Sequence, residues 1–118
     1  MKLQKFKYLL IMACLMASIS MYAQSYEWAA TLGGSLADRG QGIITDASGN
    51  VYTTGFFEGT ADFDPNPSVS RNLSSSGNKD AFVQKLDANG NLVWAGVFGG
   101  SSDDEGEAIA VDGLGNIY

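Results

Sequence analysis

One stretch of sequence occurs twice in this chain, first as residues 28–52 and again as residues 94–118. The two copies align without a gap and are identical at 12 of 25 positions. The two copies are offset by 66 residues. A repeat of this kind indicates that one supersecondary unit is used several times, because such a unit buries its apolar face only against its neighbours. The repeat therefore predicts a fold built from consecutive copies of one unit, each stabilised by its neighbours.

A shorter motif, Asp-x-x-Gly-Asn, recurs within this period. Its three copies begin at Asp46, Asp87 and Asp112, each between apolar runs. An Asp that opens a turn accepts hydrogen bonds from the backbone amides ahead of it, and a Gly three residues later supplies the positive φ that the turn needs. Each copy is therefore predicted to form a β-hairpin loop.

Strands placed around these turns number four in each period of the repeat. They are predicted over residues 42–45, 51–57, 81–86 and 92–98, and residues 69–79, rich in Ser, Asn and Gly, are predicted to lie in a long connection. Four antiparallel strands per repeat are typical of a propeller blade. The sequence thus predicts an all-β fold of four-stranded antiparallel β-propeller blades, incomplete in this chain.

The repeat also predicts how the chain is divided. Residues 24–35 are expected to form an N-terminal strand, residues 36–100 one complete blade, and residues 101–118 the truncated start of the next blade. Residues 26–32 align with residues 92–98, so the chain enters the repeat on a fourth strand. A strand of this kind removes an open edge when it completes the last blade of a ring, and we expect residues 24–35 to close the ring in this way.

Residues 1–23 have the pattern of a signal peptide. Three lysines precede an apolar run from Tyr8 to Ile19, and small residues then lead to an expected cleavage after Ala23. The run is shorter than the roughly 20 residues of a membrane-spanning helix, so no transmembrane segment is expected after cleavage. The alternative is a lipoprotein signal that ends before Cys14, which then becomes the lipidated first residue. Either reading predicts a secreted protein or one on the bacterial cell surface.

The chain that follows this leader is acidic. Residues 24–118 contain four basic and thirteen acidic side chains, a formal charge of −9. Nucleic acid and anionic membrane surfaces are not expected as partners, because binding them requires a basic surface. The whole sequence contains no His, and its single Cys lies in the leader. Ser-His-Asp or Cys-His catalysis and His-ligated zinc are therefore excluded for this stretch.

Three phrases carry a resemblance to a known family. They are WAGVFGGSSDDEGEAIAVDGLGNIY, VYTTGFFEGTADFDP and DAFVQKLDANGNLVWA, and the similarity covers residues 26–118. The chain resembles the bacterial β-propeller repeat family known as SBBP. The resemblance implies a propeller fold, a location outside the cytoplasm and, in many members, further repeats followed by a sorting or adhesion module. We therefore expect the sequence to be the N-terminal fragment of a longer exported repeat protein.

Asp62 and Asp64 are calcium candidates, and no other cofactor is expected. Carboxylate oxygens at alternate positions of a loop suit Ca²⁺, which an exported protein meets at millimolar-range concentrations. Two carboxylates are fewer than the six to eight oxygens that the ion requires. The alternative is a loop in which Asp62 and Asp64 accept hydrogen bonds from local amides ahead of Pro65.

Acidic residues differ in whether they recur. Asp38 and Asp104 are equivalent, which favours a structural role in holding the turn after Gly-Gly-Ser. Asp103, Glu105 and Glu107 have no acidic counterpart in the first copy, and a binding face would be expected to differ at such positions.

The function predicted from these features is that of a scaffold. Trp28 and Trp94 recur at one position, which favours packing between blades over stacking on a ligand. We predict a non-enzymatic exported or cell-surface propeller for interaction or adhesion, with an extracellular protein or glycan as partner. The alternative is a propeller enzyme that cleaves extracellular polysaccharide with a pair of Asp or Glu side chains. No residue is assigned a catalytic role.

Overall fold

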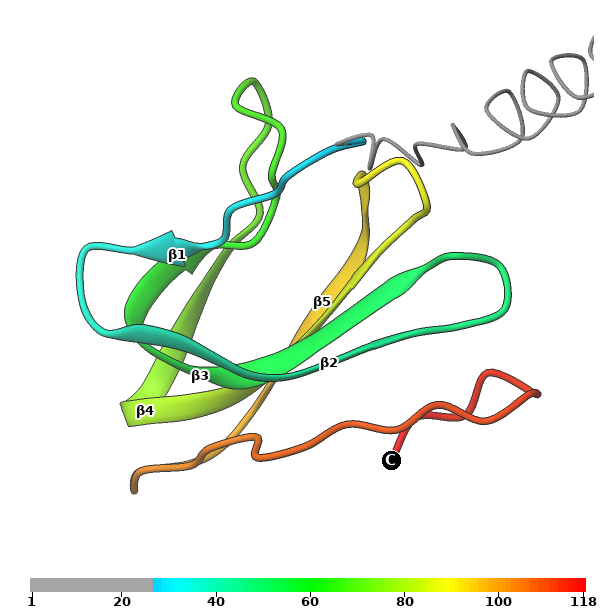
Figure 1. Cartoon of the computed structure of the whole chain (residues 1–118). Helices are drawn as coiled ribbons and strands as arrows, with labels where there is room; N and C mark the ends of the chain where they lie inside the picture. The colour runs from blue at the N-terminus through cyan, green and yellow to red at the C-terminus, as the bar shows by residue number, and fades with distance from the viewer. Residues whose placement is uncertain (1–26) are drawn as a thin grey trace, which may run out of the picture.

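The computed structural model describes residues 27–118, which form one antiparallel sheet of five strands and contain no helix (Figure 1). The all-β class predicted from the repeat is therefore correct. No helix within this range is long and apolar enough to cross a membrane. The leader predicted over residues 1–23 lies outside the described residues. The strands are β1 (Gly33–Gly34), β2 (Asp38–Thr45), β3 (Val51–Asp62), β4 (Asn72–Leu86) and β5 (Leu92–Phe98).

The strands β1 and β2 are two parts of one interrupted strand. Gly33 pairs with Asp62 and Asp38 pairs with Phe57, so both strands run along the same edge of β3. Between them the chain loops out while the Glu58 amide still donates to the Ala37 carbonyl at 3.0 Å. The remaining order is β3–β4–β5, each pair antiparallel. The sheet is thus a four-stranded meander, which is the pattern of a propeller blade.

The hairpin of β3 and β4 is longer than predicted. The expected long connection over residues 69–79 is wrong for its second part, because β4 begins at Asn72, which pairs with Asp62. The pairing register then shifts opposite Gly59. Asp80, only 1% exposed, holds this bulge by accepting hydrogen bonds from the amides of Ser76 (2.9 Å) and Gly77 (3.2 Å). The bulge breaks the alternation of apolar residues by which strands are recognised in sequence.

The two faces of the sheet have different contents because successive side chains of a strand point in opposite directions. The first face carries Phe57 and Phe82, which form an aromatic cluster with Phe63, and all three rings are fully buried. Their edge-to-face contacts place ring centroids 5.2 to 6.5 Å apart. Each buried ring stabilises the fold by roughly 1.5–3 kcal/mol. The second face carries Tyr52 and Phe56.

The first face is covered by the N-terminal segment, residues 27–32, which crosses one side of the sheet in Figure 1. Trp28, Ala30 and Leu32 are partly buried there, whereas the residues between them are exposed. Leu32 packs against the aromatic cluster. This segment was predicted to be a strand, but it pairs with no described strand and contacts the blade through side chains. Closure of a ring by residues 24–35 stays a prediction.

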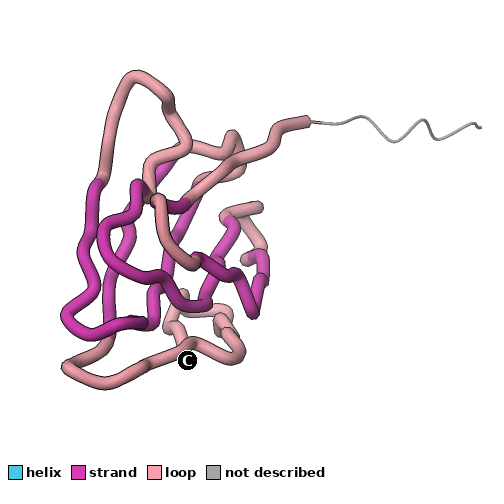
Figure 2. The backbone as a smooth tube through the Cα atoms, turned by 90° about the vertical axis from the view of Figure 1, so that its left-hand side faces the viewer, coloured by secondary structure: helices cyan, strands magenta, loops and turns pink. Residues whose placement is uncertain are grey.

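The second face is covered by the C-terminal segment, residues 103–118, which lies on the other side of the sheet (Figure 1). The Gly106 amide donates to the Gly55 carbonyl at 3.1 Å, and Gly42 lies close to the backbone of Ala108. The segment is drawn as loop in Figure 2, with one isolated bridge between Val111 and Ile117. A central blade therefore lies between two segments that the repeat assigns to its neighbours.

Candidate functional site

The three Asp-x-x-Gly-Asn turns share one geometry. In the first, the Asp46 amide donates to the Asn50 carbonyl and the Gly49 amide to the Asp46 carbonyl, both at 3.0 Å. The turns that begin at Asp87 and Asp112 repeat both hydrogen bonds at 2.9 to 3.1 Å. The turn glycines have φ values of 80, 82 and 85°. The hairpin loops predicted from the motif are therefore confirmed, including the positive φ.

The Asp carboxylates of these turns accept several hydrogen bonds each. Asp46 accepts from the amides of Ser48 and Asn50 and from the Tyr52 hydroxyl at 3.1 Å. The side-chain amide of the motif Asn donates to the Asp in all three turns and is the main reason why the pKa of each Asp lies below its usual 3.8. These carboxylates stay ionised and serve the turns, which is a structural role.

Asp38 and Asp104 also hold turns, as predicted from their recurrence. The Gly34 amide donates to Asp38 Oδ2 at 2.6 Å, and the equivalent Gly100 amide donates to Asp104 Oδ2 at 2.9 Å. The other carboxylate oxygen of Asp38 is buried and has no hydrogen-bond partner among the described residues. Asp38 and Asp104 therefore each fix the chain at a point where one unit of the repeat passes into the next.

Some of the acidic side chains in residues 103–107 bond to other described residues. Glu105 forms an ion pair with Lys79 (Nζ to Oε1, 3.0 Å) and accepts a hydrogen bond from Gln41 Nε2 at 3.3 Å. The bond from Lys79 lowers the pKa of Glu105 and raises that of Lys79. Asp103 and Glu107 are exposed and bond to no described side chain. Of the three non-recurring acidic residues, Glu105 thus fastens the C-terminal segment to the second face.

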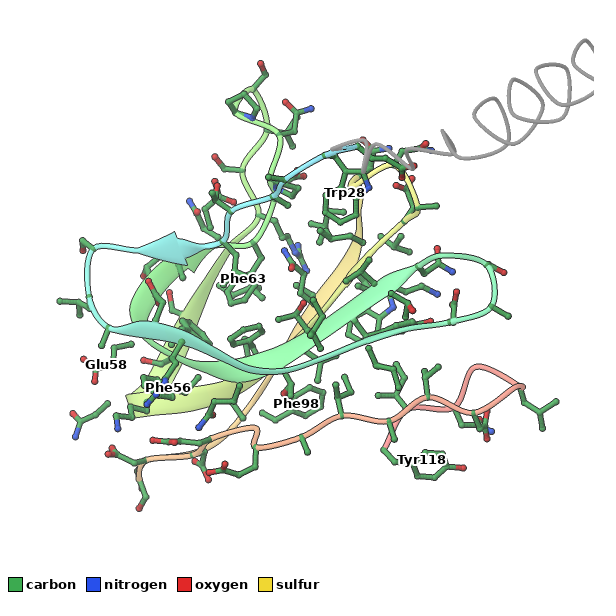
Figure 3. All side chains as sticks on the ribbon, in the orientation of Figure 1. Trp28, Phe56, Glu58, Phe63, Phe98 and Tyr118 are labelled. Atoms are coloured by element: carbon green, nitrogen blue, oxygen red, sulfur yellow. The ribbon has the colours of Figure 1, made fainter. Side chains whose placement is uncertain are left out.

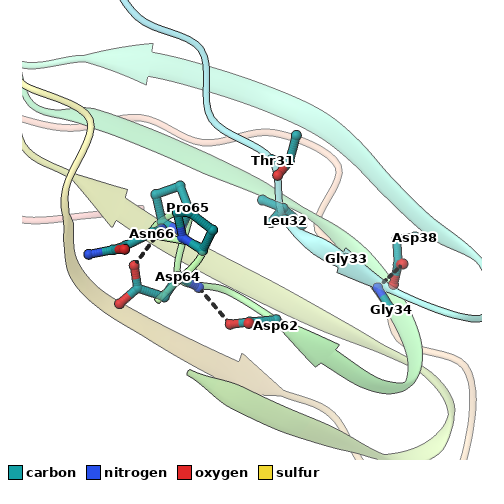
Figure 4. A pocket seen from close by; sticks show the side chains of 10 residues that line it. Thr31, Leu32, Gly33, Gly34, Asp38, Asp62, Asp64, Pro65 and Asn66 are labelled. Atoms are coloured by element: carbon teal, nitrogen blue, oxygen red, sulfur yellow. Dashed lines mark hydrogen bonds between the residues drawn. The ribbon is translucent and has the colours of Figure 1, made fainter. Parts of the chain in front are cut away.

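Asp62 and Asp64 lie at a cavity of about 390 Å³ between the N-terminal segment and the β3–β4 hairpin (Figure 4). Asp62 Oδ1 accepts from the amides of Asp64 at 3.0 Å and Arg71 at 2.8 Å. Asp64 Oδ1 accepts from the Asn66 amide at 2.9 Å. The two backbone bonds lower the pKa of Asp62, the bond from Asp64 contributing most.

This arrangement matches the alternative in which the loop carboxylates bind local amides. Within residues 27–118, no group of three or more His, Cys, Asp or Glu side chains lies close enough together to hold a metal ion. One oxygen of Asp62 and one of Asp64 are already engaged by amides. Asp62 and Asp64 stay calcium candidates that only a direct binding test can decide.

Three buried polar side chains were missed by the sequence reasoning. Gln84 Nε2 donates to the Phe63 carbonyl and Thr54 Oγ1 to the Phe82 carbonyl, both at 2.7 Å, and Asp80 holds the bulge in β4. All three lie at inward positions within strands. A polar residue at an apolar position of the alternating pattern is the signal that would have identified them.

Trp28 fixes the N-terminal segment on the hairpin between β4 and β5 (Figure 3). Its Nε1 donates to the Ala88 carbonyl at 3.0 Å. The indole lies so close to Gly90 that a Cβ added there would meet it at 2.9 Å. Trp28 therefore packs against the blade, in agreement with the role predicted from its recurrence.

Comparison with known proteins supports the repeat. Residues 27–55 match the sequence model of the family described as Beta-propeller repeat, SBBP. An uncharacterized WD repeat-containing protein of Acanthamoeba polyphaga mimivirus is 29% identical over 105 aligned residues. The alignment covers 76% of this chain but 7% of that relative, so the chain spans a small part of the relative's length. No solved structure matches the chain.

Proposed function

We propose that this chain, which carries a β-propeller repeat of the SBBP family at residues 27–55, belongs to a non-enzymatic exported or cell-surface scaffold for interaction or adhesion. Its partner would be an extracellular protein or glycan. The observation that supports this proposal most directly is the use of the recurring carboxylates, which hold turns in every copy of the repeat. Residues used in this way build a rigid frame, and recognition is left to the loops that the frame presents.

The loop between β3 and β4, residues 63–71, is the best candidate for recognition. It projects from the sheet in Figure 1 and its sequence occurs once in the chain. Pro65 and Pro67 restrict its backbone, and Val69 and Arg71 are exposed. The Asp62, Asp64 and Asn66 side chains each bond to an amide further along the loop. A preordered loop loses little conformational entropy on binding, which favours its use as a recognition element.

The proposal of export rests on the lysines, apolar run and small residues of residues 1–23. Expression of the chain with its own leader in a bacterial host tests it. The mature protein should appear outside the cytoplasm with Gln24 as its first residue, which mass spectrometry of the intact protein measures. Retention of the full-length chain in the cytoplasm would contradict export. A lipid mass attached to Cys14 would instead support the lipoprotein alternative.

The scaffold role is tested with the exported protein on a panel of immobilised polysaccharides and extracted surface proteins. Binding without release of reducing sugar is expected. Replacement of residues 65–70 by a Gly-Ser linker of the same length should abolish binding and leave the circular dichroism spectrum unchanged. The matched control is Leu114→Ser, which changes a side chain that is 90% exposed and lies outside this loop. Release of reducing sugar would support the polysaccharide-cleaving alternative.

A further inference from the structure

Two cavities share a wall formed by Pro65 and Asn66. The first is the cavity of about 390 Å³ between the N-terminal segment and the β3–β4 hairpin (Figure 4). The second, of about 230 Å³, lies between the same loop, Trp28 and the turn that joins β4 to β5. One ligand can therefore contact both cavities across these two residues.

The second cavity exists because the β3–β4 hairpin bends back over the first face. Asn66 and Asn89 lie beyond opposite ends of β4 and yet line this one cavity. The pairing of β3 with β4 is interrupted by the bulge at Gly59, and a bulge bends the strands that contain it. Phe63 holds the loop in place, because its ring lies in the aromatic cluster and its carbonyl accepts from Gln84 Nε2 at 2.7 Å. Buried contacts thus fix the walls of the cavity.

The polar side chains that line the second cavity are uncharged. They are the amides of Asn66, Asn89 and Asn91. Asn66 Oδ1 accepts from the Ser68 amide at 3.0 Å, which leaves Asn66 Nδ2 as a donor. Asn91 Nδ2 donates to Asp87 Oδ2 at 3.0 Å, which leaves Asn91 Oδ1 as an acceptor. The cavity therefore offers hydrogen-bond donors and acceptors together, without charge.

Asn89 is the lining residue that its own turn does not require. Its backbone amide donates to the turn Asp at 2.8 Å, as the amides of Ser48 and Leu114 do at the equivalent positions of the other two turns. The Asn89 side chain bonds to no described residue. Because the three turns differ at this position and share one geometry, the amide of Asn89 is available to a ligand.

Trp28 and Pro65 add rigid apolar surfaces to the second cavity. Trp28 is fixed by its bond to the Ala88 carbonyl and its contact with Gly90, so it can line the cavity and pack on the blade at once. The face of an indole carries partial negative charge and attracts the C–H groups of a ligand. A sugar ring has C–H groups on its faces and hydroxyls on its rim that both donate and accept. It therefore matches the apolar and the amide surfaces of this cavity together.

We propose that the two cavities bind a neutral oligosaccharide, with one ring between Trp28 and Asn89 and the next ring beside Asp64. Asp64 Oδ1 accepts from the Asn66 amide at 2.9 Å, and its other oxygen can accept from a sugar hydroxyl. No basic side chain lines either cavity, and the carboxylates of the first would repel a uronate or sulfate group. This inference rests on the proposed function and assigns its partner to glycans.

The test titrates the chain with hexamers of glucose, mannose, xylose and galactose, and with a galacturonate hexamer as the anionic probe. At least one neutral hexamer should shift the NMR signals of the Asn66 and Asn89 side-chain amides. Its Kd, measured by calorimetry, should rise roughly tenfold or more in Asn89→Ala. Ser48→Ala is the matched control, because it changes the equivalent position of the first turn and lines neither cavity. It should leave the Kd unchanged, and both variants should keep the Tm of the parent chain.

Three results would overturn the proposal: no shift of these amide signals with any neutral hexamer, an equal Kd in Asn89→Ala and the parent, or tighter binding of the galacturonate hexamer. The scaffold role can survive each of them. If extracted surface proteins bind, no hexamer binds and replacement of residues 65–70 abolishes the binding, the partner is a protein. The oligosaccharide site then fails while the proposed function stands.

Discussion

Lys79 and Glu105 form an ion pair of 3.0 Å that joins β4 to the C-terminal segment. Lys79 Nζ also lies 4.6 Å from the centre of the Phe56 ring, so its ammonium group contacts both the Glu105 carboxylate and this ring. The pKa of Lys79 is raised above 10.5 and that of Glu105 is lowered below 4.5, each mainly by their mutual hydrogen bond. The stabilisation is thus present across the neutral range. It is lost as the pH falls through the lowered pKa of Glu105 or rises through the raised pKa of Lys79.

Glu105→Gln should loosen the C-terminal segment with a small loss of Tm. The loss is small because both side chains remain partly solvated, where salt screens their attraction. Thermal unfolding in low salt and in 1 M NaCl measures it, and the difference between variant and parent should shrink in high salt. Glu107→Gln is the control, since the Glu107 carboxylate bonds to no described side chain. An equal loss of Tm in low salt and in 1 M NaCl would contradict an electrostatic role for Glu105.

Gly106→Ala should detach the C-terminal segment from the second face. A Cβ at Gly106 would collide with Thr54 Oγ1, and Thr54 is held in place by its bond to the Phe82 carbonyl. Overpacking of this kind costs about 1–3 kcal/mol. Hydrogen exchange of the Gly106 and Asp104 amides, which donate to the central blade, should become faster. Gly113→Ala is the control, because an added Cβ there meets nothing within 4 Å.

The strands and turns of the blade were predictable because their signals are local. Each Asp-x-x-Gly-Asn motif contains the acceptor and the glycine that its own turn requires. The outer half of β4 was not predictable, because residues 72–79 contain a single large apolar side chain, Leu73, and are ordered by Asp80 across a bulge. The Glu105–Lys79 pair was missed for another reason. Its partners are far apart in the sequence and meet only when one unit packs on the next.

Gly90→Ala should displace Trp28 as well as strain a turn. Gly90 has a φ of +82°, so any side chain costs roughly 1–2 kcal/mol, and the added methyl would also meet the indole at 2.9 Å. Gly115→Ala is the matched control, since Gly115 has a φ of +85° and its added methyl meets nothing within 4 Å. Acrylamide quenching of tryptophan fluorescence should increase for Gly90→Ala alone. An equal increase for both variants would contradict the contact between Gly90 and Trp28.

The turn carboxylates predict how stability depends on pH. The pKa values of Asp46, Asp87 and Asp112 are lowered in the folded chain, whereas the unfolded chain should titrate near 3.8. Their contribution is therefore complete above the unfolded pKa and is lost as the pH falls through the lower, folded pKa. Urea unfolding between pH 7 and pH 3 should show a plateau and then a decline below about pH 4.

Asp87→Asn separates this effect from general acid denaturation. The variant should be less stable at pH 7. It should also lose less stability on acidification, because one of the three carboxyl groups with a lowered pKa is gone. Asp103→Asn is the control, since the Asp103 side chain accepts no hydrogen bond from a described residue. It should keep the pH dependence of the parent chain. If the stability of Asp87→Asn fell with pH as steeply as that of the parent chain, the turn carboxylates would not be the cause of the loss of stability in acid.

Removal of calcium tests the loop of Asp62 and Asp64 directly. Asp62 Oδ1 already accepts two amide hydrogen bonds and Asp64 Oδ1 accepts one, so the turn is satisfied by its own backbone. We expect thermal unfolding of the chain to be the same in 5 mM EDTA and in 5 mM CaCl₂, a concentration chosen because weak extracellular sites have a Kd of roughly 0.1–1 mM. A higher Tm in calcium that Asp64→Asn abolishes would instead establish the site, because that substitution keeps an oxygen for the Asn66 amide and removes the charge.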